Sequence, residues 1–417
     1  MKDPIRVYEH EALKVGVKGF EDKHLELLSK FLGDKGEEAF PYYALINHGV
    51  KFKHYVGVIS VGNIQIEVLP KADKNSGEED QDLWENHLLT MLKAVYKLKV
   101  TLPSNAEQQV KRSRVLDVFL NRFMDEVERI MHVGLVKAYR RVEDNRTSLK
   151  GRLVMSKHII KNIVHQERFY VEYTTYDRNH IFNRLLYKTL RVIQDISASN
   201  DINLRAKRLQ FEFPELEDIV PTEALFYRLG FDRKTEDYRE AIELAKMILL
   251  NYMPNMRYQR GNSVVALMFD MNKLWEEYVY VILKRQLTDY TVSAQRYKDF
   301  WQSDTKGGKI VRPDIVIEKD GKCIAVLDTK WKIPYDGKPS DEDLKQMFVY
   351  HKYWSTNLTA LLYPGTENRQ VIGHFVKGKV ITAECSMFYL PISSERASDF
   401  LETDELIEYI TANTIVS

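Results

Sequence analysis

The chain has 417 residues, of which 44% are hydrophobic and 29% charged, and its formal net charge at pH 7 is +1. This length allows two or three domains with separate cores. A net charge so close to zero excludes a uniformly basic nucleic-acid-binding protein, so contacts with nucleic acid would have to come from local patches or from a partner. The two cysteines, Cys323 and Cys385, form no zinc or iron–sulfur motif. The first residues carry no signal-peptide run and no stretch is long and apolar enough to span a membrane, so we expect a soluble cytoplasmic protein.

Residues 1–110 are predicted to form a β-rich domain. Apolar residues alternate along residues 64–69, and Gly62-Asn63 separates this run from another at residues 55–61. A glycine–asparagine step between two such runs predicts a tight β-hairpin. Helical periodicity also predicts two helices in this domain, at residues 24–32 and 83–95.

Residues 111–255 are predicted to form a mainly helical middle region. One strand is predicted here, at residues 169–175. His180 has no nucleophile or second ligand close in sequence, so we expect a capping or core histidine rather than a catalytic one. The spacing of apolar residues predicts helices at residues 115–133, 156–164, 179–197, 204–209, 222–229 and 238–252.

The most informative stretch lies between residues 312 and 330. Two short apolar runs flank a polar segment with an Asp-Gly step, which predicts a β-hairpin. Asp314 opens the first strand, whereas Asp328 and Lys330 close the second and are expected on the same side, with Thr329 on the other. The hairpin would therefore bring two carboxylates and one ammonium group to one edge of a sheet.

This trio suits metal-assisted hydrolysis. Two carboxylates with open coordination positions can hold Mg²⁺, which prefers hard oxygen ligands. The metal lowers the pKa of a bound water and offsets charge on a phosphate, and a lysine beside it can orient the attacking water. The same residues would equally suit an ordinary ion pair on a surface hairpin, and taken alone they do not decide between the two interpretations.

Two predicted helices add polar side chains near this hairpin. Upstream, an amphipathic helix carries Glu276 and Glu277 beside its apolar stripe, and either glutamate could reach the metal edge. Downstream, Gln346 and Tyr350 lie four residues apart on a helix predicted at Asp341–Trp354, so they share one face.

These elements, in this order, resemble the core of PD-(D/E)XK nucleases. The motif stands here as Pro313-Asp314 followed by Asp328-Thr329-Lys330, and the family pattern of an aromatic residue followed by glutamate on a preceding helix favours Glu276. Gln346 and Tyr350 resemble the Gln-xxx-Tyr element of the branch that includes RecB-type nucleases. The resemblance implies a Mg²⁺ site formed by Asp314, Asp328 and Glu276. Lys330 would complete the catalytic set, and Gln346 and Tyr350 would support the site and contact the DNA.

Over most of its length the chain also resembles the McrC subunits of McrBC-type, modification-dependent restriction systems. One departure is Trp275, where the family more often has Phe. The resemblance implies that the chain pairs with a hexamer of McrB-like AAA+ subunits, which hydrolyse GTP and recognise modified cytosine in double-stranded, methylated DNA. The N-terminal part would bind and stimulate this motor, GTP would bind only to the partner, and the C-terminal domain would cut the DNA with Mg²⁺. The stretches that carry the resemblance are residues 55–59, 66–71, 88–92, 134–139, 149–153, 183–186 and 269–276.

The predicted fold is α+β and multidomain. A near match to a phosphate-binding loop at residues 373–380 lacks the Ser or Thr that would bind Mg²⁺, which agrees with a motor on a separate partner. Two alternatives stay open: a stand-alone DNA repair nuclease of the same superfamily, and a non-catalytic adaptor that activates an AAA+ motor. The predicted segments are the motor-binding domain at 1–110, the helical region at 111–255, an α/β PD-(D/E)XK endonuclease domain with a mixed central sheet flanked by helices at 256–395, and a C-terminal tail or helix at 396–417.

Overall fold

The structure is a computed structural model of the chain. It divides into two compact units, the first formed by Met1–Lys99 with Met253–Ser417 and the second by Val100–Tyr252. The predicted domain boundaries near residues 110, 255 and 395 lie outside the described residues, so they stay predictions. The described residues are 4–35, 41–62, 64–70, 81–96, 115–197, 199–253, 264–303, 307–332, 334, 336–356, 358–365, 367–377, 380–392, 401 and 403–416.

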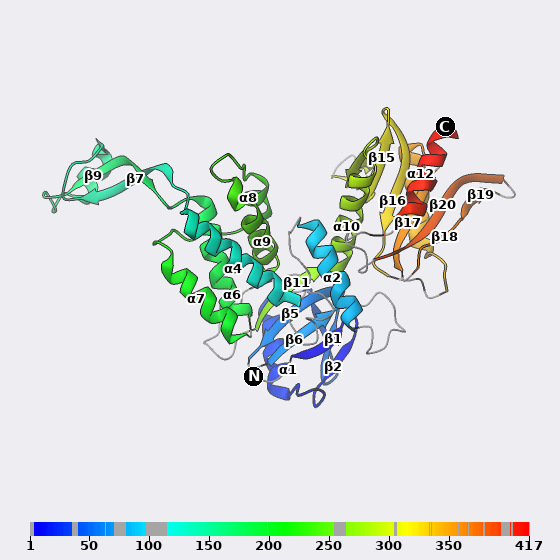
Figure 1. The fold of residues 1–417 in the computed structure, drawn as a ribbon, viewed down its shortest axis with the longest axis horizontal. Coiled ribbons are helices and arrows are strands. Elements are labelled where there is room, and N and C mark those ends of the chain that lie inside the picture. The colour runs from blue at the N-terminus through cyan, green and yellow to red at the C-terminus, as the bar shows by residue number, and fades with distance from the viewer. Residues whose placement is uncertain are drawn as a thin grey trace. The chain divides into compact units, whose positions relative to one another are not determined.

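The N-terminal part of the first unit is built on a sheet in the order β1-β6-β5-β11-β10 (Figure 1). β5 and β6 form the antiparallel hairpin that the sequence predicted, and β1 runs parallel to β6. β11 pairs antiparallel with β5, from Val264 opposite Val61 to Asp270 opposite Tyr55. This strand lies within the range predicted for the C-terminal domain, yet it completes the N-terminal sheet. The strands are β1 Ile5–Tyr8, β5 Tyr55–Val61, β6 Ile64–Leu69, β10 Tyr252–Met253 and β11 Val264–Asp270.

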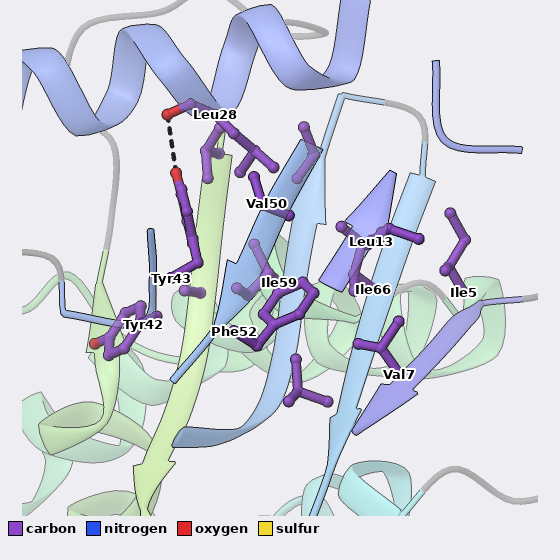
Figure 2. Close-up of a cluster of buried hydrophobic side chains, with 14 of the residues drawn as sticks. Ile5, Val7, Leu13, Leu28, Tyr42, Tyr43, Val50, Phe52, Ile59 and Ile66 are labelled. Atoms are coloured by element: carbon purple, nitrogen blue, oxygen red, sulfur yellow. Dashed lines mark hydrogen bonds between the residues drawn. The ribbon is translucent and has the colours of Figure 1, made fainter. Parts of the chain in front are cut away.

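A second, smaller sheet and one helix enclose the N-terminal core (Figure 2). Ile59, Ile66 and Met268 from the large sheet are each 2% exposed or less. The Tyr43 hydroxyl donates a hydrogen bond of 2.9 Å to the carbonyl oxygen of Leu28, which ties the small sheet to the helix. The predicted first helix is therefore confirmed and is longer than expected. The elements are β2 Ala12–Lys14, β3 Tyr43–Ile46, β4 Gly49–Phe52 and α1 Asp22–Lys35.

The second unit is mainly helical, and each of its α-helices overlaps a segment that apolar spacing predicted. α6 buries one stripe of apolar side chains, including Leu185, Leu186 and Leu190. His180 caps this helix, since its Nδ1 accepts a hydrogen bond of 3.2 Å from the backbone N–H of Phe182, which confirms the capping role. The helices are α4 Val115–Val133, α5 Met155–Lys161, α6 Ile181–Ile196, α7 Asn200–Glu212, α8 Glu223–Tyr227 and α9 Arg239–Leu250, with a 3₁₀ turn at Glu236–Tyr238.

A three-stranded antiparallel sheet also belongs to the second unit. β7 (Ala138–Arg146) pairs with β9 (Phe169–Asp177) along its full length, and β8 (Arg152–Leu153) adds to β9. Figure 1 shows β7 and β9 as a long, narrow arm. The sequence predicted β9 but not β7, because β7 lacks the apolar alternation of a half-buried strand.

The C-terminal part of the first unit holds a seven-stranded mixed sheet in the order β12-β15-β16-β17-β20-β18, with β19 paired to β20. β15 and β16 are antiparallel, whereas β16, β17 and β20 run parallel to one another. The predicted mixed sheet is therefore present. β19 and β20 pair antiparallel where the sequence nearly matches a phosphate-binding loop. The strands are β12 Thr291–Ala294, β15 Ile315–Lys319, β16 Lys322–Thr329, β17 Leu358–Gly365, β18 Arg369–Val371, β19 His374–Lys377 and β20 Val380–Pro391.

Helices cover both faces of this sheet. α11 packs Met347 with Val326 and Met387 on one face. On the other face, Tyr409 of α12 lies against Phe388, with ring centroids 5.3 Å apart. Within the described residues, no helix combines the length and apolar character needed to cross a membrane. The helices of this part are α2 Gln81–Val95, which packs against α10, and α10 Met271–Gln286, α11 Asp341–Trp354 and α12 Asp404–Val416.

Candidate functional site

The hairpin of β15 and β16 delivers the candidate catalytic residues to one edge of the C-terminal sheet. Asp320 and Gly321 have φ angles of 50° and 78°, so both central residues of the two-residue turn are left-handed, as a type I′ hairpin turn requires. Ala325, Val326 and Leu327 are each 0% exposed, so this part of β16 is buried on both faces. The register shifts once between Ile317 and Glu318, and the end of β16 then lies beside the start of β15, with Ile315 opposite Leu327.

The two aspartates and the lysine come together at this edge. Lys330 Nζ lies 2.6 Å from Asp328 Oδ2, and the Asp328 side chain is almost completely buried. Asp314 Oδ2 accepts two hydrogen bonds from Thr329, one from its backbone N–H at 2.7 Å and one from its hydroxyl at 2.8 Å. Thr329 was expected to point away from the site, but its hydroxyl and amide hold Asp314 in place.

Gln346 and Tyr350 reach the same edge from α11. Gln346 Oε1 accepts a hydrogen bond of 3.1 Å from Lys330 Nζ, and its Nε2 donates to the Tyr350 hydroxyl at 2.7 Å. The same Nε2 lies 3.4 Å from Asp328 Oδ1. The Tyr350 hydroxyl in turn donates to the carbonyl oxygen of Arg312 at 3.0 Å. One connected network therefore joins α11 to both strands of the hairpin.

Glu276 approaches from α10. This helix begins where β11 ends, because the carboxylate of Asp270 accepts a hydrogen bond of 2.9 Å from the backbone N–H of Asn272. Glu276 accepts a hydrogen bond from the side-chain amide of Gln295, whose backbone N–H donates to the carbonyl oxygen of Asp314 at 2.9 Å. Gln295 thus connects Glu276 to Asp314.

The carboxylates crowd one another in a buried setting. Burial raises the pKa of Glu276 to about 7, and the charge on Asp314 adds to this effect. Burial and the charge of Asp314 also raise the pKa of Asp328, whereas Lys330 opposes the rise. The pKa of Lys330 would be lowered by burial, but the negative charges of Asp328 and Asp343 outweigh this, so the pKa is raised and the ammonium stays charged.

Three residues of the site were not predicted. Gln295, in the left-handed region at φ 53°, is placed by a backbone turn and carries no motif that sequence analysis could recognise. Thr329 was named only as a spacer. Asp343 is buried, with Lys332 Nζ at 2.8 Å and Lys330 Nζ at 3.6 Å. Its position three residues after the helix cap Ser340 is a recognisable signal, since acidic residues favour the first turn of a helix.

The donor set suits a hard divalent cation. Oxygen atoms of Asp314, Asp328 and Glu276 are the ligand type that Mg²⁺ prefers, and Mg²⁺ is usually held by one or two carboxylates together with water. Burial, together with the charge of Asp314, raises the pKa of both Glu276 and Asp328. Among the residues that the structure describes, no three His, Cys, Asp or Glu side chains converge into a preformed metal-binding cluster.

A comparison with protein families identifies one family. The model of the McrBC 5-methylcytosine restriction system component family matches residues 50–364. A solved half-complex from a tetradecameric assembly of Thermococcus gammatolerans McrB AAA+ hexamers with bound McrC contains a similar chain, with a TM-score of 0.63 and 20% identity, covering 99% of this chain and 100% of that chain. At this identity the likeness shows a shared fold.

The cryo-EM structure of the Thermococcus gammatolerans McrBC complex also contains a similar chain, with a TM-score of 0.45 and 22% identity, covering 68% of this chain and 88% of that chain. No curated protein matches the sequence. The family match extends over most of the chain, from β4 through β17. The chain therefore belongs to the family of McrBC 5-methylcytosine restriction system components.

Proposed function

We propose that this chain is the nuclease subunit of a modification-dependent restriction complex and that it hydrolyses phosphodiester bonds of double-stranded DNA. Its C-terminal sheet would then be a PD-(D/E)XK core. The observation that carries the proposal is the meeting of Asp314, Asp328 and Lys330 at one sheet edge, with Glu276 connected to them through Gln295.

The proposed metal ligands are Asp314, Asp328 and Glu276. Within the described residues, Thr329 occupies only Oδ2 of Asp314, so Oδ1 is available to a cation. When bound, Mg²⁺ would supply a water of lowered pKa and offset charge on the scissile phosphate. These carboxylates cost free energy when ionised and buried together, and a divalent cation would relieve their repulsion.

Lys330 is the proposed partner of the attacking water. Its ammonium is held by Asp328 and the Gln346 amide, with Asp343 Oδ1 at 3.6 Å, and in this proposal it also meets a water or a phosphate oxygen. A positive group held in this way stabilises negative charge that develops on the phosphate. Gln346 and Tyr350 keep the ammonium in place, and their polar edges face the same side as the substrate in this proposal.

The proposed partner is a hexamer of McrB-like AAA+ subunits. The support is the family match and the shared fold with a chain from a complex of McrB AAA+ hexamers with bound McrC. In this proposal the N-terminal part of the chain, residues 1–110, binds and stimulates the motor, GTP binds to the partner alone, and the partner recognises methylated DNA.

A single substitution tests the catalytic part. Asp328→Asn keeps the shape of the side chain but removes the charge, so we expect DNA cleavage with partner, GTP and Mg²⁺ to fall below detection while stimulation of the partner's GTPase persists. Asp320→Asn is the matched control, because it lies in the exposed turn at the other end of the same hairpin and asparagine accepts left-handed backbone. Loss of both activities in Asp328→Asn would make Asp328 a structural residue.

The same assay separates the two alternative functions. Cleavage of unmethylated DNA by the chain alone, without GTP, would place it among stand-alone nucleases. Intact GTPase stimulation without any cleavage by the parent chain would make it a non-catalytic adaptor.

A further inference from the structure

A hairpin of exposed residues begins and ends inside the candidate site. It consists of β13 (Lys298–Gln302) and β14 (Gly308–Val311), which pair antiparallel. Gln295, three residues before β13, donates a hydrogen bond to Glu276. Arg312, directly after β14, accepts one from the Tyr350 hydroxyl at 3.0 Å. Both ends of the hairpin are therefore fixed to residues of the nuclease site.

The base of the hairpin is also fixed to α11. Lys298 Nζ donates a hydrogen bond of 2.7 Å to the carbonyl oxygen of Tyr353 and lies 5.0 Å from the centre of the Trp354 ring. The rings of Phe300 and Tyr353 are 5.7 Å apart. Because α11 carries Gln346 and Tyr350, these contacts give the hairpin a defined position beside the site.

Large apolar side chains of this hairpin face solvent. Tyr297 is 67% exposed, Trp301 56% and Ile310 50%. Grouped, exposed apolar side chains on a soluble protein mark an interaction surface. Trp301 is paired with Lys309 across the two strands, so both side chains lie on the same face of the hairpin.

The hairpin is basic although the whole chain is nearly neutral. Its described residues, 296–303 and 307–312, contain four cationic side chains and one carboxylate, against a net charge of +1 for 417 residues. Arg296 is paired with Glu318. Within the described residues, Lys309 has no carboxylate partner, so its ammonium group is available to a phosphate. The cationic residues are Arg296, Lys298, Lys309 and Arg312.

We propose that the hairpin of β13 and β14 binds the DNA duplex next to the scissile bond, with Lys309 on a backbone phosphate and Trp301 against the bases. The inference rests on the proposed nuclease function. A two-stranded ribbon has the dimensions to enter a DNA groove. Cationic side chains bind the backbone phosphates of a duplex, and an apolar ring beside them can contact base edges in the groove. The tethers to Glu276 and Tyr350 place this contact within reach of the catalytic edge.

Binding of a fluorescent duplex to the full chain tests the proposal. The chain carries Asp328→Asn so that the DNA stays intact, and affinity is measured by anisotropy over a range of salt concentrations. Lys309→Gln should weaken binding and make the slope of log affinity against log salt shallower by about 0.9, the amount expected for one lost phosphate contact. Trp301→Ala should weaken binding by about tenfold without changing the slope, because an apolar contact in the groove releases no counterion. Trp301→Phe should retain most of the affinity.

Lys322→Gln is the matched control, because Lys322 is an exposed lysine at the start of β16, away from the catalytic edge. The same substitutions are also made in a chain that keeps Asp328. DNA cleavage by these variants, with partner and GTP, gives an independent readout. A parent chain that binds and cuts DNA while the Lys309 and Trp301 variants behave like the control would overturn the hairpin proposal alone. A parent chain that neither binds nor cuts DNA would overturn the proposed nuclease function as well.

Discussion

Gln346 illustrates how one neutral residue can organise a charged site. Its amide accepts a hydrogen bond from Lys330 and donates one to Tyr350, which only a group with both donor and acceptor atoms can do. Because the amide is uncharged, it orients the ammonium without adding to the repulsion between Asp314 and Asp328. In the proposed function, Gln346 would therefore be a positioning residue rather than a catalytic group.

We predict that Gln346→Leu slows cleavage by about 10- to 100-fold, as is usual when a residue that orients a catalytic ligand is removed. The reason is that Lys330 loses its neutral acceptor and the Tyr350 hydroxyl loses its donor. Single-turnover cleavage measures the chemical step. Thermal unfolding serves as the control, because a leucine of similar volume should leave the core beneath α11 intact. An unchanged cleavage rate would show that Lys330 needs no such support.

We predict that metal binding and stability both depend on pH through Glu276. Burial, with help from Asp314, raises the pKa of Glu276 to about 7, above its ordinary value of 4.5. The folded form therefore holds a proton that the unfolded chain has lost between pH 4.5 and 7, so the free energy of unfolding of the metal-free protein falls as the pH rises through this window. Binding of Mg²⁺ must expel that proton, so affinity should rise with pH and level off above 7.

Glu276→Gln should make both pH dependences shallower, whereas the neighbouring Glu277→Gln should preserve them. Denaturant unfolding of the metal-free protein at pH 5 and pH 8 gives the first quantity, and calorimetric Mg²⁺ titration gives the second. If Glu276→Gln and Glu277→Gln gave the same pH dependences, Glu276 would not be a ligand of the proposed metal site.

Sequence analysis predicted the site residues whose positions are determined by local sequence patterns. Asp314, Asp328 and Lys330 follow from strand ends and an Asp-Gly turn, and Gln346 with Tyr350 follows from helical spacing. Gln295 could not be predicted, because its contact with Glu276 crosses 19 residues and depends on a left-handed backbone at a residue other than glycine. Contacts of that kind are set by tertiary packing.

At the scale of elements, β11 and α10 connect the N-terminal sheet to the site. β11 pairs with β5 up to Asp270, and Asp270 is also the cap of α10, which carries Glu276. His54 Nε2 lies 3.7 Å from Asp270 Oδ2, and the hydrogen bond to this carboxylate is the main reason that the pKa of His54 is raised. β11 thus belongs to the N-terminal sheet, and α10, which follows it without a loop, packs against strands of the C-terminal sheet.

The close packing of β5 against β11 requires glycine at position 57. Gly57 has a φ of 138°, and a Cβ atom there would lie 2.2 Å from the carbonyl oxygen of Leu267. We predict that Gly57→Ala lowers the free energy of unfolding by more than about 1 kcal/mol, because the backbone conformation and the contact are both unfavourable. Chemical denaturation measures the change.

Gly33→Ala is the control, because we expect it to raise the free energy of unfolding rather than lower it. Gly33 lies in α1 and a Cβ atom there would meet nothing within 4 Å, so alanine should stabilise the helix by about 0.5–1 kcal/mol. If Gly57→Ala left the free energy of unfolding unchanged, β5 and β11 would not pack as closely as described.

At the scale of the whole molecule, the order of segments along the chain differs from the order of folding units. The first unit uses both ends of the chain, and the second is inserted between them. Sequence patterns identified most helices and several strands, but they gave no sign that β11 returns to β5. β11 and β5 are about 200 residues apart in sequence. Whether two such strands pair depends on which apolar surface is still exposed in the partly assembled sheet, and local sequence does not contain this information.

This arrangement predicts which fragments fold alone. The second unit takes its core from its own helices, and Arg205 of α7 forms ion pairs with Glu128 and Asp125 of α4 within the same unit. A fragment of residues 100–252 should therefore unfold cooperatively in thermal circular dichroism.

A fragment of residues 1–99 lacks β11, so β5 becomes an open edge and the core around Ile59 loses Met268. We expect this fragment to aggregate or stay unfolded, and to gain structure when residues 253–270 are supplied on the same chain through a short linker. A fragment of residues 1–99 that folds without β11 would contradict the assignment of β11 to the N-terminal core, and it would leave α10 without a fixed link between that core and Glu276.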